Sequence, residues 1–425
     1  MSWRTPQGEY VRTSQVAAQS APLRVLYLSW RDRDNPEAGG AEVFTERTSE
    51  VMSDLGAQVT IFASKFPGAR SHDRHGNVRV IRQGGRFGCY LAGLAHLVRR
   101  RDDYDVVLDV QNGVPFWAPL VSKVPVINVT HHVHKDQWPV IFGPRIARLG
   151  WFLESRIAPR VYRGSRYITV SRATQDDLGD LGINVADIDL VYSGNDLPDD
   201  YDSYELVPRT QHPSMVVVCR LVPHKQVELA IDVLAHLRDQ IPDLTLDIVG
   251  SGYWRAELER HAQAREVADR VLFHGFVDEN TKHTLLARAW LSLMPSHKEG
   301  WGLTIVEAGL HGTPTIAFAH AGGPSESIVH GISGLLAQDI HDMTEQVRVL
   351  LTHHDLHEEL GRGARKHARG FSWEAAGEQV HQVALSVLGR GSRPATPSTA
   401  RVNPKRIDQI VREYEIERSL SRTHA

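Results

Sequence analysis

Little in this sequence points to a disulfide framework, a membrane span or a nucleic-acid ligand. Its 425 residues contain two cysteines, Cys89 and Cys219, which are too few for a disulfide scaffold or a cysteine-based zinc site. No run of about 18 apolar residues occurs, and the polar first twenty residues lack the apolar core of a signal peptide. The net charge of −3 gives no overall attraction to nucleic acid. We therefore expect a cytoplasmic protein that binds no nucleic acid.

The length and the order of the apolar segments predict two domains. A chain of 425 residues exceeds what one hydrophobic core usually organises. Strands that are apolar throughout alternate with helical stretches, first from Arg24 to Tyr192 and again from Ser214 to Gln338. This pattern is typical of parallel sheets covered by helices on both faces. We predict an α/β protein with two Rossmann-like, doubly wound parallel-sheet domains that face a cleft.

Composition suggests where the domains begin and end. An acidic, proline-containing stretch at 196–212 is typical of a linker, and a helical run after Ser372 is expected to cross back onto the N-terminal domain. Residues 389–404 have the composition of a disordered segment. The predicted parts are a flexible extension (1–21), an N-terminal domain (22–200), a C-terminal domain (201–388) and a largely disordered tail (389–425) with a short helix at 406–420.

Two glutamates around a glycine-rich turn make residues 297–307, HKEGWGLTIVE, the most informative segment. Gly300 and Gly302 allow a turn in which backbone amides face outward without an obstructing Cβ. Residues 303–310 have the pattern of a short amphipathic helix. Free amides and the helix dipole then point at the same place, which predicts an anion site, such as a phosphate site, between Glu299 and Glu307.

The two glutamates are predicted to have separate roles. Eight helical steps would rotate the chain by about 800°, and Glu299 lies before the helix rather than on it, so the pair need not share a face. This argues against the acid and base of a glycosidase. We expect Glu299 to contact sugar hydroxyls and Glu307 to accept hydrogen bonds from a ribose diol. The amides of Gly302, Leu303 and Thr304 would bind phosphate.

Further candidate residues follow the strands of the second half. Arg220 and Lys225 lie five positions apart after the strand SMVVVC, where a guanidinium and an ammonium suit a diphosphate leaving group. A solvated pair of loop cations is the alternative interpretation. Gly250 and Gly252 occupy the corresponding end of the strand LTLDIV, although two such glycines are by themselves weak evidence.

Taken together, these segments resemble retaining glycosyltransferases of family 4, which have the GT-B fold. EGWGLTIVEAGLHGTPTIAFAHAGGPSESI resembles their donor-site signature, with GGAE, YITVSRAT, LVYSGNDL, CRLVPHK, IVGSG and FHGFV in the expected order. LVYSGNDL stands where the family usually has an NGVD-type segment. The resemblance covers residues 22–388.

The resemblance implies an activity and its site. The activity is metal-independent, front-face transfer of a sugar from a nucleotide-diphosphate sugar, most often a UDP- or GDP-sugar, to a glycan, lipid-linked or small-molecule acceptor. No cofactor is implied. Gly39 and Gly40 would approach the donor phosphate or the acceptor, and the loop containing Phe276 would hold the base. Arg220 and Lys225 would neutralise the leaving diphosphate.

The segment PVINVTHHVHKDQW supplies the predicted catalytic histidine. His131 falls where similar enzymes place a histidine near the donor sugar, with His132 as an alternative. His131, His132 and His134 are also a conceivable zinc site, but no cysteine or carboxylate is spaced to complete it. The acidic segments at 32–34 and 187–189 mimic a metal-binding DxD motif, which arises often by chance.

Residues 143–166 carry many arginines together with Ile146, Leu149, Trp151 and Phe152. This composition suits a helix lying on the anionic inner face of a membrane, which would help an enzyme with a lipid-linked acceptor. The alternative interpretation, an ordinary covering helix whose basic face meets water, is somewhat favoured.

Two other functional classes stay open at this point. One is a GT-B enzyme of another activity, such as a sugar-nucleotide epimerase or a phosphorylase. The other is a binding subunit that keeps the fold without catalysis.

Overall fold

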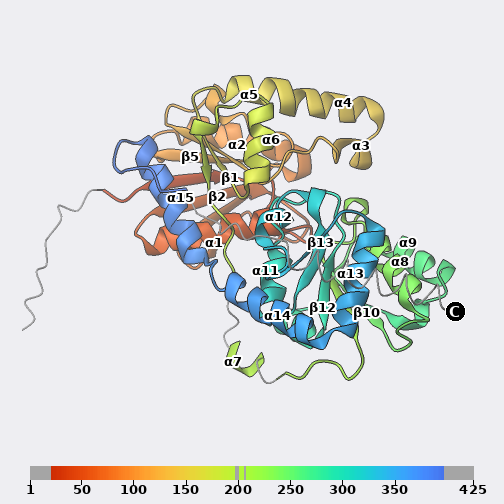
Figure 1. The fold of residues 1–425 in the computed structure, drawn as a ribbon. Helices are drawn as coiled ribbons and strands as arrows, with labels where there is room; N and C mark the ends of the chain where they lie inside the picture. Colours follow the sequence, from red (N-terminus) through yellow and green to blue (C-terminus); the bar gives the residue numbers. More distant parts are fainter. Residues whose placement is uncertain (1–20, 197–200, 205–206, 397–425) are drawn as a thin grey trace, which may run out of the picture.

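The computed structural model describes residues 21–196, 201–204 and 207–396, which form two α/β domains (Figure 1). Most of the predicted N-terminal extension, and the tail beyond residue 396 with its predicted helix at 406–420, lie outside these described residues.

The N-terminal domain is built on a sheet with the strand order β3-β4-β2-β1-β5-β6-β7-β8. Its central strands are rich in valine, isoleucine and leucine and are almost fully buried, because helices cover both faces of the sheet. The strands are β1 (Arg24–Leu28), β2 (Gln58–Ser64), β3 (His72–His75), β4 (Val78–Gln83), β5 (Val106–Gln111), β6 (Val126–Thr130), β7 (Arg166–Thr169) and β8 (Ile188–Leu190).

The edge strand β3 runs antiparallel to β4, whereas every other neighbouring pair in this sheet is parallel. The sequence analysis did not predict it, because HDRH has no apolar residues to reveal a strand. Ion pairs hold it instead: Asp73 contacts Arg82 at 3.1 Å, and His75 contacts Glu46 at 2.5 Å. This sheet is therefore parallel except at the edge formed by β3.

The C-terminal domain has a parallel sheet with the strand order β11-β10-β9-β12-β13-β14. Together with the first sheet, it confirms the prediction of two parallel-sheet α/β domains. The strands are β9 (Ser214–Val218), β10 (Thr245–Val249), β11 (Val271–Gly275), β12 (Leu291–Met294), β13 (Thr315–Phe318) and β14 (Gly334–Ala337).

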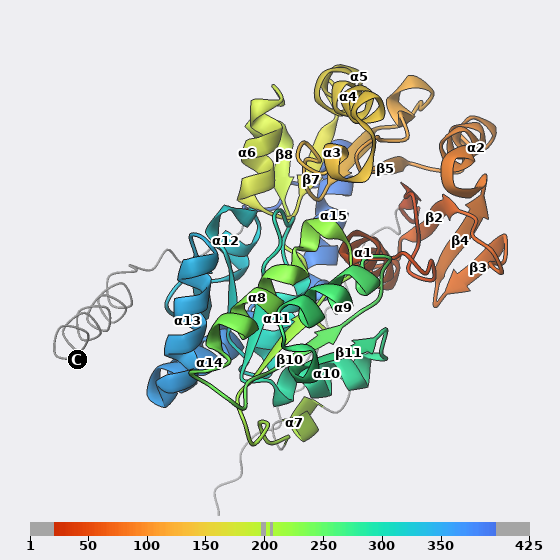
Figure 2. The same cartoon turned by 90° about the vertical axis from the view of Figure 1, so that its right-hand side faces the viewer.

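Helices cover both faces of each sheet. In the C-terminal domain α8, α9 and α13 pack on one face (Figure 2) and α10 and α11 on the other. The helices are α1 (Gly40–Asp54), α2 (Gly85–Arg99), α3 (Trp138–Ile141), α4 (Pro144–Phe152), α5 (Ala158–Val161), α6 (Arg172–Asp180), α7 (Tyr201–Tyr204), α8 (Val227–Leu237), α9 (Arg255–Ala264), α10 (Glu279–Arg288), α11 (Leu303–Leu310), α12 (Pro324–Ser327), α13 (Ile340–Thr352), α14 (His354–Ala368) and α15 (Trp373–Val387).

Side-chain caps explain where several helices begin. Ser171 accepts a hydrogen bond from the Thr174 amide at the start of α6, and Asp278 does the same for Thr281 at the start of α10. Ser372 caps α15 through the Ala375 amide. Each side chain satisfies an amide that the helix itself leaves without an acceptor.

The last helix, α15, lies against α1 of the N-terminal domain in both views (Figures 1 and 2). Trp373 and Val380 of α15 share one buried cluster with Phe44 of α1. Trp301 and Val306, from the glycine-rich motif, belong to the same cluster. An apolar core therefore continues from one domain into the other.

No helix within the described ranges is long and apolar enough to cross a membrane. The two cysteines do not form a disulfide.

Candidate active site

A cleft of about 1600 Å³ separates the two domains, and both contribute to its walls. All thirteen predicted site residues line it. They are Gly39, Gly40, His131, Arg220, Lys225, Gly250, Gly252, Phe276, Glu299, Gly302, Leu303, Thr304 and Glu307. The structure therefore brings together residues that lie up to 268 positions apart in the chain, since Gly39 and Glu307 both line the cleft. Their individual roles stay predictions.

The glycine-rich turn has the geometry that an anion site needs. Gly302 caps α11 with a φ of 93°, a left-handed conformation that favours glycine. Helix α11 then spans Leu303–Leu310, as the sequence predicted. A Cβ at Gly300 would lie 2.4 Å from the His131 carbonyl oxygen, so this glycine lets the two domains touch.

Two helix amino termini meet at this turn. A Cβ added to Gly40, the first residue of α1, would lie 3.2 Å from Leu303 Cδ1 at the start of α11. The Gly39 amide donates to Glu42 Oε2 at 2.7 Å, which fixes the start of α1. Because the first amides of a helix lack intrahelical acceptors and carry partial positive charge, both ends favour a bound anion.

Close packing explains why positions 250 and 252 are glycine, while their predicted role in donor binding stays a prediction. A Cβ at Gly250 would lie 1.9 Å from the Cys219 carbonyl oxygen, and one at Gly252 would lie 2.1 Å from that of Leu221. The loop after β10 thus packs directly on the loop that carries Arg220 and Lys225. These glycines shape the cationic loop through close packing.

Each motif glutamate is paired with a lysine from outside the motif. Lys225 Nζ lies 2.5 Å from Glu299 Oε1, and Lys282 Nζ lies 2.9 Å from Glu307 Oε1. Lys282 also contacts Glu279 at 2.7 Å. The sequence analysis missed Lys282, because it lies in α10, and only the packing of α10 on α11 reveals its partner.

Arg220 connects the two sides of the cleft. Its Nη1 donates to the Glu37 carbonyl oxygen of the N-terminal domain at 3.1 Å. Burial, together with the nearby Arg31, lowers the pKa of Arg220 from its ordinary value. Arg31 itself lines the cleft and pairs with Glu42 at 3.0 Å. The sequence analysis also missed Arg31, which follows a strand in the N-terminal half.

His131 is the histidine best placed to contact a ligand. Its Nε2 is buried and has no hydrogen-bond partner within the described ranges. Burial, reinforced by His134, lowers the pKa of His131 to about 4, so the imidazole is neutral near pH 7. His132 is already engaged, because its Nε2 lies 3.1 Å from Gln137 Oε1. The two histidines thus differ in their hydrogen bonding, and the choice between them stays a prediction.

His134 has a buried carboxylate partner that sequence reasoning missed. Its Nδ1 lies 3.0 Å from Glu154 Oε1, and Trp138 Nε1 donates to Glu154 Oε2 at 2.6 Å. Its Nε2 lies 3.1 Å from Asn112 Oδ1. Glu154 reaches this position from a π-helical turn, Leu153–Ile157, that continues α4. The three histidines therefore have three different environments.

In the part of the chain that the structure describes, the one group with metal-ligand geometry is Asp34, Asp73 and His75, away from the three histidines. Arg82 lies among these groups, 2.6 Å from Asp34 and 3.1 Å from Asp73. Arg82 also pairs with Asp32 at 2.7 Å. The guanidinium of Arg82 thus pairs with both aspartates of the acidic segment at 32–34. These ion pairs give the segment a structural role.

Phe276 follows β11 and is 86% exposed on the cleft wall. Tyr253, after β10, is 71% exposed on the same wall. Large exposed rings at the edge of a cleft favour stacking against a flat ligand group.

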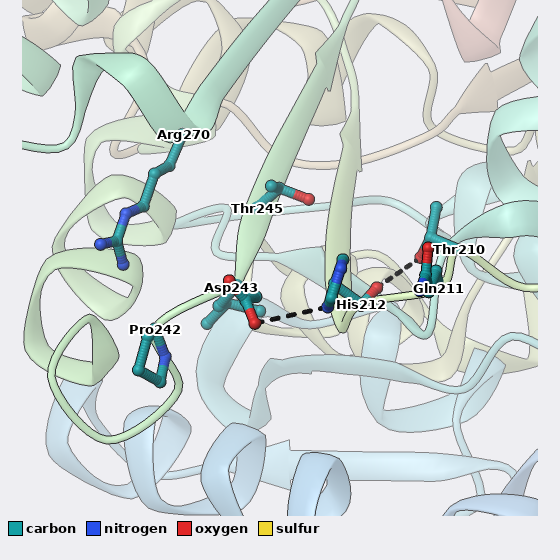
Figure 3. A pocket seen from close by; sticks show the side chains of 8 residues that line it. Thr210, Gln211, His212, Pro242, Asp243, Thr245 and Arg270 are labelled. Carbon is teal, nitrogen blue, oxygen red and sulfur yellow. Dashed lines mark hydrogen bonds and ion pairs between the residues drawn. The ribbon is translucent and has the colours of Figure 1, made fainter.

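A second hollow lies in the C-terminal domain, by the amino ends of β9 and β10 (Figure 3). It measures about 420 Å³, and His212 and Asp243 form an exposed 3.4 Å pair at its edge. None of the thirteen predicted residues lines it. It is separate from the candidate active site.

The arginine-rich segment at 143–166 forms α4, the π-helical turn and α5, at the top of the N-terminal domain in Figure 1. Ile146, Leu149 and Phe152 are at least half exposed along α4. Arg145 and Arg148 are exposed on the same helix. Ile146 also lines the cleft, so this apolar ridge is continuous with the candidate site.

Comparisons with known proteins agree with this geometry. The sequence model of the family described as "Glycosyltransferase Family 4" matches residues 38–198, and that of "Glycosyl transferases group 1" matches residues 202–367. Glycogen synthase of Mycobacterium tuberculosis is 28% identical over 278 residues, covering 64% of this chain and 66% of that protein. D-inositol 3-phosphate glycosyltransferase of Jonesia denitrificans is 37% identical over 169 residues, covering 38% and 40%. The chain thus matches 40 to 66% of the length of these relatives.

Solved structures show the same fold. Sucrose-phosphate synthase of Thermosynechococcus elongatus has a TM-score of 0.73 at 20% identity, covering 86% of this chain and 99% of that one. HepE of Anabaena, in complex with UDP and glucose, has a TM-score of 0.67 at 19% identity, covering 86% and 100%. The prediction of a GT-B fold is confirmed.

Proposed function

Because the chain belongs to glycosyltransferase family 4, we propose that it transfers a sugar, with retention, from a nucleotide-diphosphate sugar to an acceptor in the N-terminal half of the cleft. The observation that carries this proposal is the convergence of Arg220, Lys225 and the amino terminus of α11 on one cleft wall. These groups supply positive charge where a diphosphate would leave. The HepE complexes with UDP and with UDP-glucose make a UDP-sugar the first donor to test.

The proposed chemistry follows from that charge. Arg220 and Lys225 stabilise the negative charge that develops on the departing diphosphate, and the amides at the start of α11 hold its phosphates. Glu299, kept in place by Lys225, orients the sugar hydroxyls. The neutral imidazole of His131 contributes a hydrogen bond at the sugar without adding charge. The acceptor attacks from the face that the leaving group vacates, and a phosphate oxygen takes its proton.

The proposed role of the cationic groups also removes the need for a metal. A divalent cation in this reaction would neutralise the diphosphate, and here two protein cations and two helix termini supply that charge. The acceptor is a glycan, a lipid-linked sugar or a small polyol. Glycogen synthase and the inositol-phosphate glycosyltransferases among the relatives carry names that fit the first and last of these classes.

We further propose that the exposed face of α4 rests on an anionic membrane at the cytoplasmic side. The support is its ridge of exposed Ile146, Leu149 and Phe152, which exposed arginines flank. Apolar side chains enter the interface while cations meet lipid phosphates. The continuity of this ridge with the cleft would let a lipid-linked acceptor reach the site from the membrane.

The test is turnover of a panel of UDP-, GDP-, ADP- and TDP-sugars, preselected by the rise in melting temperature that native-state binding causes. We expect release of nucleoside diphosphate with at least one donor. Arg220→Ala and Lys225→Ala should each lower turnover by about 100-fold or more, because the leaving-group charge is left unbalanced. Arg362→Ala and Lys366→Ala, exposed on α14, are the matched controls and should leave the rate unchanged.

Three other results would contradict the proposal. Near-normal turnover in both site variants would remove Arg220 and Lys225 from the chemistry. An epimerised sugar nucleotide would identify a GT-B epimerase. Binding of a sugar nucleotide without any turnover would identify a non-catalytic binding subunit.

A further inference from the structure

Lys282 occupies a position in the cleft that the proposed chemistry does not use. It lies on α10, outside the glycine-rich motif, and lines the cleft together with Glu279 and Glu307. Its Nζ is 2.9 Å from Glu307 Oε1 and 2.7 Å from Glu279 Oε2. The Lys282 side chain is only 14% exposed, and that of Glu307 is 20% exposed.

The partial burial of this pair distinguishes it from an ordinary surface ion pair. Burial by itself lowers the pKa of Lys282, but the Glu307 and Glu279 carboxylates outweigh that effect, and the pKa lies above its usual range. The ammonium therefore stays charged across the neutral range. Lys282 thus donates a charge-assisted hydrogen bond to Glu307, which is stronger than a hydrogen bond between neutral groups.

The contact also restricts the direction of Glu307. A glutamate side chain samples several rotamers on an open helix face, and ordering it costs entropy when a ligand binds. Lys282 holds Oε1, while Oε2 has no recorded hydrogen-bond partner among the described residues. The carboxylate is thus oriented before a ligand arrives, and Oε2 together with the second lone pair of Oε1 can still accept hydrogen bonds.

The arrangement parallels the other motif glutamate. Lys225, in the loop after β9, pairs with Glu299 with its Nζ 2.5 Å from Oε1. Lys282, in α10, pairs with Glu307 in the same way. Each lysine neutralises a carboxylate that would otherwise repel the donor diphosphate at close range. Two lysine–glutamate pairs therefore lie at the two ends of the proposed donor.

We propose that Lys282 is a positioning residue: by holding Glu307, for which the sequence already predicts a contact with the ribose diol, it makes a ribonucleotide bind more tightly than its 2′-deoxy analogue. This inference rests on the proposed function, because it assumes that the cleft binds a nucleotide. A fixed carboxylate accepts from the 2′- and 3′-hydroxyl groups together. Removing the 2′-hydroxyl leaves one of its two acceptor interactions unmade.

The test compares the binding of UDP and GDP with that of their 2′-deoxy analogues to the full chain, by titration calorimetry. The wild-type protein should bind the ribonucleotide about tenfold more tightly than its 2′-deoxy analogue, because a hydrogen bond to a charged group is lost. Lys282→Met should weaken binding of the ribonucleotide about tenfold and change binding of the 2′-deoxy analogue little, so that the preference falls towards one.

Two variants serve as controls, and others test the pair itself. Glu279→Gln removes the exposed partner of Lys282 and should keep the preference, because the contact with Glu307 is retained. Lys366→Met, on the exposed face of α14, is the matched lysine control. Glu307→Gln should reduce the preference as Lys282→Met does, and the double variant should be no worse than either single one. If Lys282→Met does not fold, Glu307→Gln and Lys282→Arg replace it in the test. Glu307→Gln should lose the preference for the ribonucleotide, and Lys282→Arg should keep part of it.

A Lys282→Met protein that still prefers the ribonucleotide as strongly as the wild type would overturn the inference, as would a Glu307→Gln protein that does so. Wild-type protein that binds the ribonucleotides and their 2′-deoxy analogues equally well would also overturn the inference, while leaving the proposed function intact. Wild-type protein that binds neither UDP nor GDP would refute the proposed function and this inference with it.

Discussion

At the scale of single residues, the candidate site depends on groups whose charge is set by burial. His131 is neutral because its buried ring disfavours the protonated form, and its buried Nε2 has no hydrogen-bond partner among the residues that the structure describes. Arg220 and Lys225 instead place a guanidinium and an amine on the wall that the C-terminal domain contributes. The N-terminal wall thus combines the neutral His131 with the ion pair of Arg31 and Glu42, which also line the cleft.

The buried His131 makes stability depend on pH in a predictable direction. The pKa of His131 in the folded protein is about 4, against an ordinary value of 6.5. Its contribution to stability is fully present above pH 6.5, because neither state then binds the proton. Stability is lost as the pH falls from 6.5 towards 4, where only the unfolded chain is protonated.

We expect His131→Gln to lose less stability on acidification than the wild type does. Between pH 7.5 and pH 5.0 the difference in the free energy of unfolding should be roughly 2 kcal/mol, at about 1.4 kcal/mol for each unit below 6.5. Urea unfolding at the two pH values measures it. Other buried histidines, such as His224 and His311, titrate in both proteins and cancel in the comparison. Parallel pH profiles for the two proteins would contradict the prediction.

At the scale of elements, the contact between α15 and α1 ties the end of the C-terminal half to the N-terminal domain. A Cβ added at Gly377 of α15 would lie 2.4 Å from Val51 Cβ of α1. The two helices approach this closely because glycine has no side chain. Trp373 and Val380 bury apolar surface on either side of that contact.

Gly377→Ala should therefore destabilise the protein by about 1 to 3 kcal/mol, since the helices must separate to admit the methyl group. Chemical unfolding followed by circular dichroism measures the change. Gly88→Ala, in α2, is the control, because nothing lies within 4 Å of the added Cβ. Alanine is the better helix former, so the control should be neutral or slightly stabilising. Equal effects of the two substitutions would rule out close packing at Gly377 as the cause.

The elements also show which features the sequence could reveal. Helix α11 has its predicted bounds, because Gly302 marks its start and the apolar pattern marks its extent. Strand β3 was missed, because ion pairs rather than apolar alternation hold it at the sheet edge. The burial of the Glu154 side chain was missed as well, because it depends on a π-helical segment inside a helical stretch.

At the scale of the whole molecule, the ridge of exposed apolar residues on α4 begins at the rim of the cleft, because Ile146 belongs to both. Val140, Phe142 and Ile146 line the cleft, and Leu149 and Phe152 continue the ridge away from it. A membrane against this ridge would lie beside the entrance for an acceptor. On the membrane proposal, an acceptor could then enter the cleft from a lipid surface.

The membrane proposal predicts co-sedimentation with vesicles that contain phosphatidylglycerol and little binding to vesicles of phosphatidylcholine alone. Arg145→Glu with Arg148→Glu should abolish the binding, because like charges then face the lipid phosphates. Leu149→Ser with Phe152→Ser should weaken it by removing apolar insertion. Arg362→Glu with Lys366→Glu, on α14 of the other domain, is the matched charge control. Binding that does not depend on anionic lipid would contradict the proposal.

The sequence by itself determined the two parallel-sheet domains, the helix after Gly302 and the thirteen residues that line one cleft. The domains and the helix follow from apolar patterns and glycine positions, which are properties of neighbours along the chain, and several of the thirteen residues follow from the resemblance to a family. The partners of these residues were decided by the tertiary structure: Lys282 for Glu307, Glu37 for Arg220 and the His131 carbonyl for Gly300. Such contacts join residues distant in sequence, and only the packing of one domain against the other brings them within hydrogen-bonding distance.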